Sequence, residues 1–227
     1  MKSRSHLFFR SLIQFVGLFF ARRTLTGAEN VRQDEPAVFV CNHMGSYGPV
    51  MMTLFFPFPF RPWVTYQIVT RRICTDYLEA HFTQNELRLG RPFSRWVAAI
   101  IAPFCIMLVR GTGAIPVFAG STQIRKTIDQ SVDAVEQGDN LVIFPENDDR
   151  KHSAFINEFD TGFIHLGEIF HKKTGRNLYF YPVCINKNKK SISIGKPIIF
   201  SMRPFRKEKQ RIKAYLQDSI DEMVQSH

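Results

Sequence analysis

The sequence predicts a single-domain α/β sandwich, in which a central mixed, largely parallel sheet is flanked by helices and preceded by an N-terminal amphipathic helix. Short apolar runs alternate with stretches of helical periodicity along the chain, an order that is typical of α/β folds. The 227 residues are 44% hydrophobic, enough for one well-buried core, and no linker rich in Gly, Ser or Pro divides them. The chain also starts with an apolar segment whose polar positions recur with a helical period.

The N-terminal helix is predicted from residues 7–21. Their least hydrophobic positions recur at intervals of four, three and four residues, and therefore form one narrow stripe on a helix. Those positions are Arg10, Gln14, Gly17 and Ala21, and the flanking basic residues are Lys2, Arg4, Arg22 and Arg23. This pattern is typical of a helix that lies in a membrane interface and is attracted to anionic headgroups. We therefore predict a membrane-interface helix over residues 1–24 and an α/β domain over residues 25–227.

The interfacial helix has three alternatives: a signal peptide, a transmembrane span and a helix of the protein's own core. A signal peptide needs small residues at its cleavage site, and residues 19–22 (Phe-Phe-Ala-Arg) form a poor one. A transmembrane span needs roughly 18 or more apolar residues, and Arg10 and Gln14 interrupt the run too early. A wide apolar stripe also suits a helix packed on the protein's own core, and this alternative stays open.

The α/β domain is predicted to contain six strands, at residues 37–41, 63–69, 114–118, 141–144, 178–185 and 191–194. Apolar faces predict helices over residues 121–137 and 204–225. The first of these helices ends at Gly138, a residue type that commonly terminates helices. A further apolar run at residues 97–109 contains Pro103 and is too short to span a bilayer. It predicts either a buried, kinked helix or a segment that dips into a membrane.

The charge of the chain implies an anionic partner, because the net charge is +10 and the isoelectric point lies near 9.7. Nucleic acid, an anionic membrane surface and a phosphate-bearing substrate all meet this requirement. No nucleic-acid-binding module is recognisable in the sequence. The 22 phenylalanines, many in adjacent pairs, favour lipid, although most of them are expected to fill the core. We therefore expect an anionic phospholipid membrane as a partner, and no nucleic acid.

The cysteines argue against a metal centre. Cys41, Cys74, Cys105 and Cys184 lie far apart, mostly inside apolar runs, and no C-x-x-C pair or histidine at metal-ligand spacing accompanies them. They are interpreted as buried, reduced thiols of a cytoplasmic protein, and no metal site is expected.

Two strand ends carry the candidate catalytic groups. Residues 38–41 form an apolar run that leads into Asn42 and His43, and residues 141–144 form a second run that leads into Glu146. In open α/β sheets, ligands bind beyond the carboxyl ends of the strands, so we expect His43 and Glu146 to share one site. A histidine in such a position suits a general base. The plainer alternatives are a structural histidine and a glutamate that accepts backbone amides at a helix start.

Four short blocks with plausible spacing extend this pattern over roughly residues 25 to 200. They are Gly27-Ala28-Glu29-Asn30 with Pro36 and Asn42-His43, then Gly113-Ala114-Ile115-Pro116-Val117, then Phe144-Pro145-Glu146, and finally Tyr181-Pro182-Val183. In this order they resemble the motifs of the glycerolipid acyltransferase family, which includes the 1-acylglycerol-3-phosphate acyltransferases. Each block alone is a weak signal, and the specificity lies in the ordered set.

In that family the histidine removes a proton from a glycerol hydroxyl, which then attacks the carbonyl carbon of an acyl thioester or acyl phosphate. The resemblance therefore implies His43 as the general base of an O-acyltransferase in phospholipid biosynthesis. It implies acyl-CoA, acyl-carrier protein or acyl phosphate as the acyl donor, a lysophospholipid or glycerol-phosphate acceptor, and no cofactor. With the N-terminal helix, it predicts a peripheral protein at the cytoplasmic face of the cell membrane.

The chain departs from the family pattern first at the position five residues after the histidine. An aspartate there orients the imidazole in the family, whereas this chain has Gly48. Glu146, Tyr47 or a backbone carbonyl could orient His43 instead. The same departure supports an alternative, a catalytically degenerate relative that binds acyl or phospholipid ligands; a basic nucleic-acid-binding protein is the third hypothesis.

Two further departures concern the acceptor phosphate. The arginine that the family carries after its second block is absent, and Arg125 or Lys126 could replace it. The third block continues as residues 147–149 (Asn-Asp-Asp) in place of Gly-Thr-Arg, which leaves Arg150 or Lys151 to offset the added negative charge. The predicted substrate-binding residues are therefore Asn42, Glu146, Arg150 and Arg125.

Overall fold

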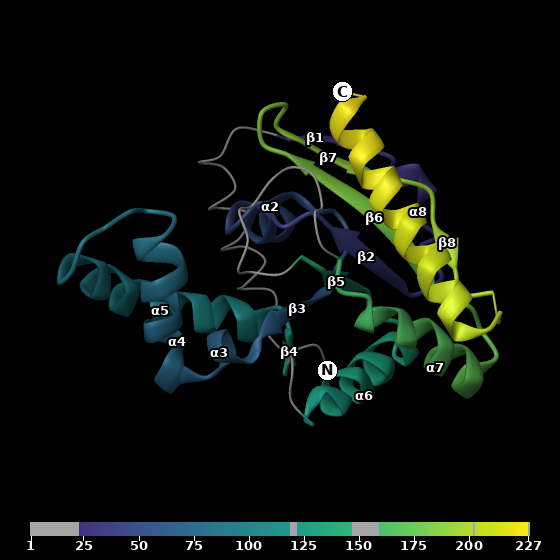
Figure 1. Cartoon of the computed structure of the whole chain (residues 1–227), viewed down its shortest axis with the longest axis horizontal. Coiled ribbons are helices and arrows are strands. Elements are labelled where there is room, and N and C mark those ends of the chain that lie inside the picture. The colour runs from purple at the N-terminus through teal and green to yellow at the C-terminus, as the bar shows by residue number, and fades with distance from the viewer. Residues whose placement is uncertain (1–22, 119–121, 147–158, 202, 227) are drawn as a thin grey trace. The chain divides into compact units, whose positions relative to one another are not determined.

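The computed structural model describes residues 23–118, 122–146, 159–201 and 203–226 (Figure 1). Residues 1–22, on which the predicted interfacial helix depends, lie outside these ranges. The described residues divide into two compact units: unit 1 comprises residues 61–118 and 122–127, and unit 2 comprises residues 23–60, 128–146, 159–201 and 203–226. Each unit is described by itself.

Unit 2 is built on a mixed, largely parallel sheet, as predicted. Its strands are β1 (Thr24–Thr26), β2 (Ala37–Cys41), β5 (Leu141–Ile143), β6 (Tyr179–Asn186), β7 (Ser191–Ile194) and β8 (Ile198–Ile199). They are arranged in the order β1-β7-β6-β2-β5, and β8 pairs with β6. The β1·β7, β2·β5 and β2·β6 pairs are parallel, whereas β7 and β8 run antiparallel to β6.

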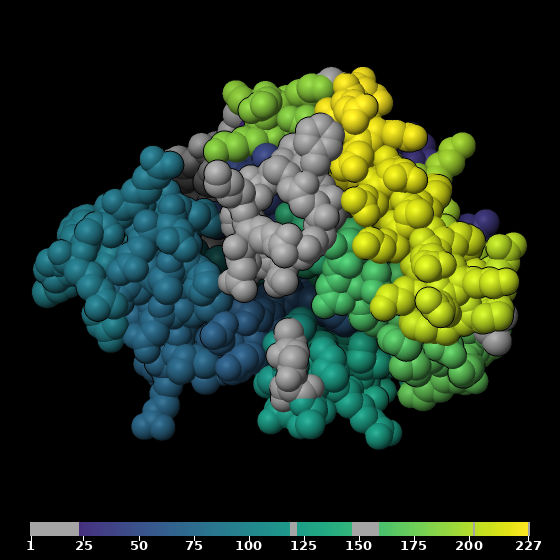
Figure 2. All heavy atoms as spheres, viewed as in Figure 1, coloured from purple at the N-terminus to yellow at the C-terminus, as the bar shows by residue number. Residues whose placement is uncertain are grey.

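Helices cover both faces of this sheet. They are η1 (Ala28–Asn30), α2 (Tyr47–Phe55), η3 (Gly162–Ile164), α7 (His165–Thr174), α8 (Phe205–Gln225) and the greater part of α6 (Ile124–Glu136). On one face, Met51 and Met52 of α2 pack with Phe39 and Tyr181. On the other face α7 comes so close to β6 that a Cβ on Gly167 would lie 3.0 Å from the Phe180 ring. Here α8 lies along β6 and forms a ridge on the surface of unit 2 (Figure 2).

This two-sided cover explains why the central strands are apolar at every position. All five residues of β2 are at most 1% exposed, as expected of a parallel strand with helices on both faces. The predicted strands at 37–41 and 191–194 match β2 and β7, and those at 141–144 and 178–185 match β5 and β6 within one residue at each end. The predicted strand at 114–118 matches β4 (Ile115–Val117), in unit 1, equally closely. Part of the Phe-rich segment also belongs to the core, since Phe56 and Phe58 pack on Phe39 with ring centroids 4.7 and 6.0 Å away.

Unit 1 contains a parallel pair of strands and a helical cluster. The elements are β3 (Arg61–Thr65), α3 (Tyr66–Val69), α4 (Arg71–Leu78), the π-helical segment η2 (Glu79–Gln84), α5 (Phe93–Gly111), β4 (Ile115–Val117) and the start of α6. The prediction of a strand over 63–69 is wrong after Thr65. The β3·β4 pairing ends where Thr65 faces Val117, and the chain then turns into α3, whose Ile68 packs on a buried cluster of α4 and α5.

The apolar run at 97–109 belongs to the longer helix α5. Only one side of this helix is buried: Ser94, Ala98, Ala102 and Ile106, four residues apart, face the rest of unit 1. Pro103 lies within the helix. The predicted helix is therefore present, but it is half exposed and not buried as one of the two alternatives required. The alternative of a segment that dips into a membrane stays a prediction.

Candidate active site

His43 and Glu146 are brought together by the register of two parallel strands. In the β2·β5 pair, Val40 faces Ile143. His43 and Glu146 each come three residues after this pair and therefore lie at the same level of the sheet edge. The backbone N–H of His43 donates a hydrogen bond of 3.0 Å to Oε1 of Glu146. The two strand ends that were predicted to share one site are thus in contact.

Asn42 fixes the end of β2 to its other neighbour, β6. The residue is fully buried. Its amide nitrogen donates to the carbonyl oxygen of Ile185 at 3.0 Å, and its side-chain oxygen accepts from the N–H of Ile185 at 2.7 Å. A buried amide with both groups bonded holds the backbone in one place. The substrate contact predicted for Asn42 stays a prediction; the contact present in the structure positions His43.

A tight turn carries the imidazole away from the strand. Met44 and Gly45 have φ angles of 50° and 65°, a left-handed conformation that is uncommon for a residue other than glycine. The N–H of Gly48 then donates to the carbonyl oxygen of His43 at 3.1 Å, where α2 begins. The imidazole lies edge-on to the Phe144 ring, with centroids 5.0 Å apart. His43 is partly exposed, and its Nδ1 atom is buried.

The close approach of Gly48 to this turn leaves no space for a side chain. A Cβ at position 48 would lie 3.0 Å from the carbonyl carbon of His43 and 3.1 Å from the carbonyl oxygen of Asn42, and it would overlap the carbonyl oxygen of His43. The turn therefore accepts a residue other than glycine at this position only if the backbone shifts.

Burial changes the ionisation of Glu146. Desolvation raises the pKa of its carboxyl from an ordinary value of 4.5 to about 7, although the hydrogen bond from the His43 N–H acts in the opposite direction. Near neutral pH the group therefore exchanges between a carboxylate and a neutral acid. A site with such a group beside a histidine is suited to proton transfer.

Replacing Glu146 by glutamine tests this ionisation and keeps an oxygen that can accept the His43 N–H. Because the folded-state pKa lies above the ordinary value, the native protein retains a proton that the unfolded chain has lost, and the free energy of unfolding decreases as the pH rises through this range. After an allowance for partial exposure, the contribution is about 2 kcal/mol. Urea unfolding between about pH 5 and about pH 8 should show a pH dependence that is weaker by this amount in Glu146→Gln. An identical pH dependence in the two proteins contradicts the raised pKa.

Cys41, two residues before His43, is unsuited to act as a nucleophile. Burial raises its pKa well above the usual value, and Cys184 and Glu146 raise it further, so the thiol stays protonated. Burial also raises the pKa of Cys184 to about 12 and that of Cys105 to about 11. Within the described ranges, no group of three or more His, Cys, Asp and Glu residues is placed to hold a metal ion.

Two cations that the sequence did not single out as site residues flank Tyr47, which opens α2 after the histidine turn. The guanidinium carbon of Arg23 lies 5.9 Å and Nζ of Lys187 lies 5.5 Å from the centroid of its ring. Arg23 also donates from Nε to Sδ of Met51 at 3.3 Å. Lys187 directly follows β6, so its position at a strand end, like those of His43 and Glu146, is visible in the sequence.

The described structure does not test the other two predicted phosphate-binding residues, Arg125 and Arg150. Arg125 lies in the first turn of α6, in unit 1, whereas His43 lies in unit 2. Arg150 lies outside the described residues. Their roles stay predictions.

The fold and this strand-end pair define an α/β protein in which a histidine and a glutamate meet at the carboxyl edge of the sheet. Residues 22–186 match the family model described as Acyltransferase. This match covers most of the chain and runs through both units, and the protein therefore belongs to the Acyltransferase family, whose chemistry is acyl transfer.

Among solved structures, the chain is similar to the 1-acyl-sn-glycerophosphate (LPA) acyltransferase PlsC from Thermotoga maritima. The TM-score is 0.56 at 13% sequence identity, and the match covers 99% of this chain and 85% of that one. At this identity the likeness establishes a shared fold. No curated protein sequence matches the chain.

Proposed function

We propose that this protein is a membrane-associated O-acyltransferase that moves a fatty acyl group from a thioester or acyl-phosphate donor to the hydroxyl of a glycerol-phosphate-type acceptor. The contact between His43 and Glu146 at adjacent strand ends, within a chain of the Acyltransferase family, is the observation that carries this proposal. The PlsC-like fold supports a lysophospholipid such as lysophosphatidic acid as the acceptor.

His43 acts as the general base in the proposed reaction. Nδ1 is buried while the side chain is partly exposed, so Nε2 is assigned as the nitrogen that meets the acceptor. It takes the proton of the acceptor hydroxyl as the oxygen attacks the acyl carbonyl carbon. The tetrahedral intermediate then collapses, the bond to the thiolate or phosphate breaks, and the imidazolium returns its proton to the leaving group or to solvent. Glu146 is a positioning residue, because its contact is with the backbone of His43.

Acyl transfer by the purified full-length protein tests the proposal. Acyl-CoA, acyl-carrier protein and acyl phosphate are each paired with lysophosphatidic acid and with glycerol 3-phosphate, and products are identified by mass spectrometry. At least one pair should yield an acylated acceptor together with an equal amount of released donor group. The absence of product in all pairs contradicts the enzyme assignment.

A second candidate function, ligand binding without turnover, is favoured by Gly48. In the family a carboxylate at this position orients the base, and here the space for one is filled by backbone. Saturable binding of lysophosphatidic acid by a protein that forms no product with any donor would establish this alternative.

Arg23 and Lys187 are proposed to attract the acceptor phosphate. Nη1 of Arg23 is buried with no hydrogen-bond partner among the described residues, and a buried cationic N–H group favours an anionic ligand. Replacing either residue by glutamine should raise KM for lysophosphatidic acid about tenfold and leave KM for an uncharged monoacylglycerol unchanged. Lys209→Gln, an exposed position on α8, is the control. An equal rise in KM for both acceptors contradicts a phosphate contact.

A further inference from the structure

The exposed side of α5 in unit 1 carries a continuous apolar stripe. Its members recur at intervals of three, four, four and three residues and therefore lie on one face of the helix. They are Phe93, Trp96, Ile100, Phe104 and Met107, with exposed fractions of 62%, 71%, 73%, 45% and 43%. Large side chains that are aligned and exposed in this way mark an interaction surface.

Basic residues stand at both ends of this stripe. Arg88, Arg91 and Arg95 precede or begin α5, and Arg110 lies in its last turn. Residues 61–118 contain seven arginines and only three acidic residues. A surface with an apolar centre and cationic ends complements a membrane, in which anionic headgroups surround the hydrocarbon.

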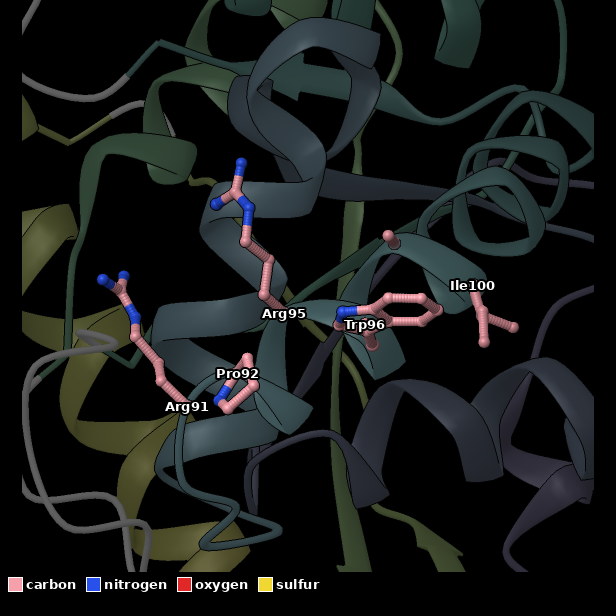
Figure 3. A pocket seen from close by; sticks show the side chains of 6 residues that line it. Arg91, Pro92, Arg95, Trp96 and Ile100 are labelled. Atoms are coloured by element: carbon pink, nitrogen blue, oxygen red, sulfur yellow. The ribbon is translucent and has the colours of Figure 1, made fainter.

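A hollow joins the cationic and apolar parts of this surface. It has a volume of about 460 Å³ and is lined by Arg91, Pro92, Arg95, Trp96, Ala99 and Ile100. In Figure 3 the indole of Trp96 reaches toward Ile100, while the guanidinium groups of Arg91 and Arg95 lie at the other end. An aromatic ring between charged and apolar groups is typical of the boundary between headgroups and acyl chains.

The two arginines are held in place from beneath by one carboxylate. Glu79, whose side chain is 3% exposed, accepts from Nε of Arg91 at 2.9 Å and from Nη1 of Arg95 at 3.0 Å. Arg95 also pairs with Asp76 at 2.9 Å. The arginine side chains nevertheless remain 73% and 58% exposed, so each is oriented by the protein while most of its surface faces outward.

The packing of α5 favours a helix that lies in the interface over one that crosses the bilayer. Among the described residues, α5 is the one helix that is long and apolar enough to span, with 22% of its most apolar stretch buried. Its uninterrupted apolar part, residues 96–109, measures only about 21 Å as a helix, against about 30 Å of hydrocarbon. The opposite side packs through Ala98 and Ala102 on α4, whose Arg71 and Arg72 are exposed.

We propose that the α5 stripe and the flanking arginines form a docking surface for anionic phospholipid, on which α5 lies parallel to the membrane with Trp96 among the headgroups and upper acyl chains. This surface does not depend on residues 1–22 or on His43. Loss of the contact between α5 and the membrane can therefore be distinguished from loss of catalysis at His43.

Tryptophan fluorescence tests the contact locally, because the chain contains only Trp63 and Trp96. The full-length protein is mixed with vesicles of phosphatidylcholine alone or with added phosphatidylglycerol, some carrying a spin-label quencher on the acyl chain. We expect the emission to shift to shorter wavelength and to be quenched with phosphatidylglycerol vesicles. Both effects should disappear in Trp96→Phe, an exposed substitution that leaves the core intact, and should persist in Trp63→Phe.

A partition measurement with matched variants completes the test. Ile100→Ser combined with Phe104→Ser should lower vesicle partitioning about a hundredfold, whereas Ile124→Ser with Ile169→Ser, exposed isoleucines on α6 and α7, should leave it unchanged. Vesicle binding without quenching of Trp96, or no vesicle binding, overturns the proposal. A shift of the Trp96 emission that depends on protein concentration in the absence of lipid overturns it as well, because a second copy of the chain then covers this face.

Discussion

Replacing His43 by alanine is expected to lower the rate of acyl transfer about 10³-fold, because general bases contribute roughly 10² to 10⁴ to the rate. The change removes the imidazole and leaves the backbone N–H that binds Glu146. The side chain is partly exposed and packs on Phe144, so the fold should survive. The measurement is kcat/KM for the donor and acceptor pair that is most active with the wild-type protein, together with thermal unfolding.

A surface histidine provides the control for this substitution. His171→Ala removes a partly exposed ring on α7 whose Nδ1 lies 3.1 Å from the carbonyl oxygen of Arg176, and it should leave the rate unchanged. Equal rates for the wild-type protein and His43→Ala, with both proteins folded, contradict the role of His43 as general base.

The second large effect is expected at Gly48. Restoring the family aspartate by Gly48→Asp should reduce the stability by about 3 kcal/mol and lower the activity, because the new Cβ has to displace the backbone of residues 42 and 43. In serine proteases, loss of the carboxylate that orients the histidine costs about 10⁴ in turnover. If the turn opened to accept the aspartate, the turnover would therefore rise by a large and easily measured factor.

Gly48→Ala separates the steric effect from the charge. It introduces the same Cβ without a carboxylate, and the two variants should lose similar free energies of unfolding in urea. A variant Gly48→Asp that is as stable as the wild-type protein and more active would show that the turn accommodates the aspartate. In that case the chain differs from the family pattern only in lacking the carboxylate that orients His43.

The strand positions could be predicted because the sheet is covered on both faces. A strand buried on both sides must be apolar throughout, and this makes β2 and β5 visible as unbroken runs. Their polar ends then follow directly, which is how His43 and Glu146 were found. The register that places the two residues at one level depends on pairing between distant segments, and no local pattern contains it.

The errors lie where tertiary contacts decide the structure. Residues 66–69 have the composition of a strand, but β3 loses its partner after Thr65, and the helix α3 packs the partly buried Ile68 on α4 and α5 instead. The exclusion of a side chain at Gly48 also depends on packing, since the sequence shows only that a glycine is present. For α5, the sequence gives the helical period, but only the fold shows which stripe is buried and which is exposed.

The cations near the site illustrate the same distinction. The family blocks predict Arg125 and Arg150 as phosphate-binding residues. The structure instead places two other cations beside one ring, that of Tyr47. Arg23 comes from the segment before β1 and Lys187 directly follows β6, and neither belongs to one of the family blocks. Contacts between such distant residues are properties of the fold.

The most direct test of the proposed mechanism is an experimental structure of the protein with lysophosphatidic acid and a non-reactive acyl-CoA analogue bound. The acceptor hydroxyl should lie about 3 Å from Nε2 of His43, within hydrogen-bond reach, with the acyl carbonyl on its far side. An acceptor bound with its hydroxyl away from His43, or an imidazole enclosed by packed apolar side chains, would contradict the account.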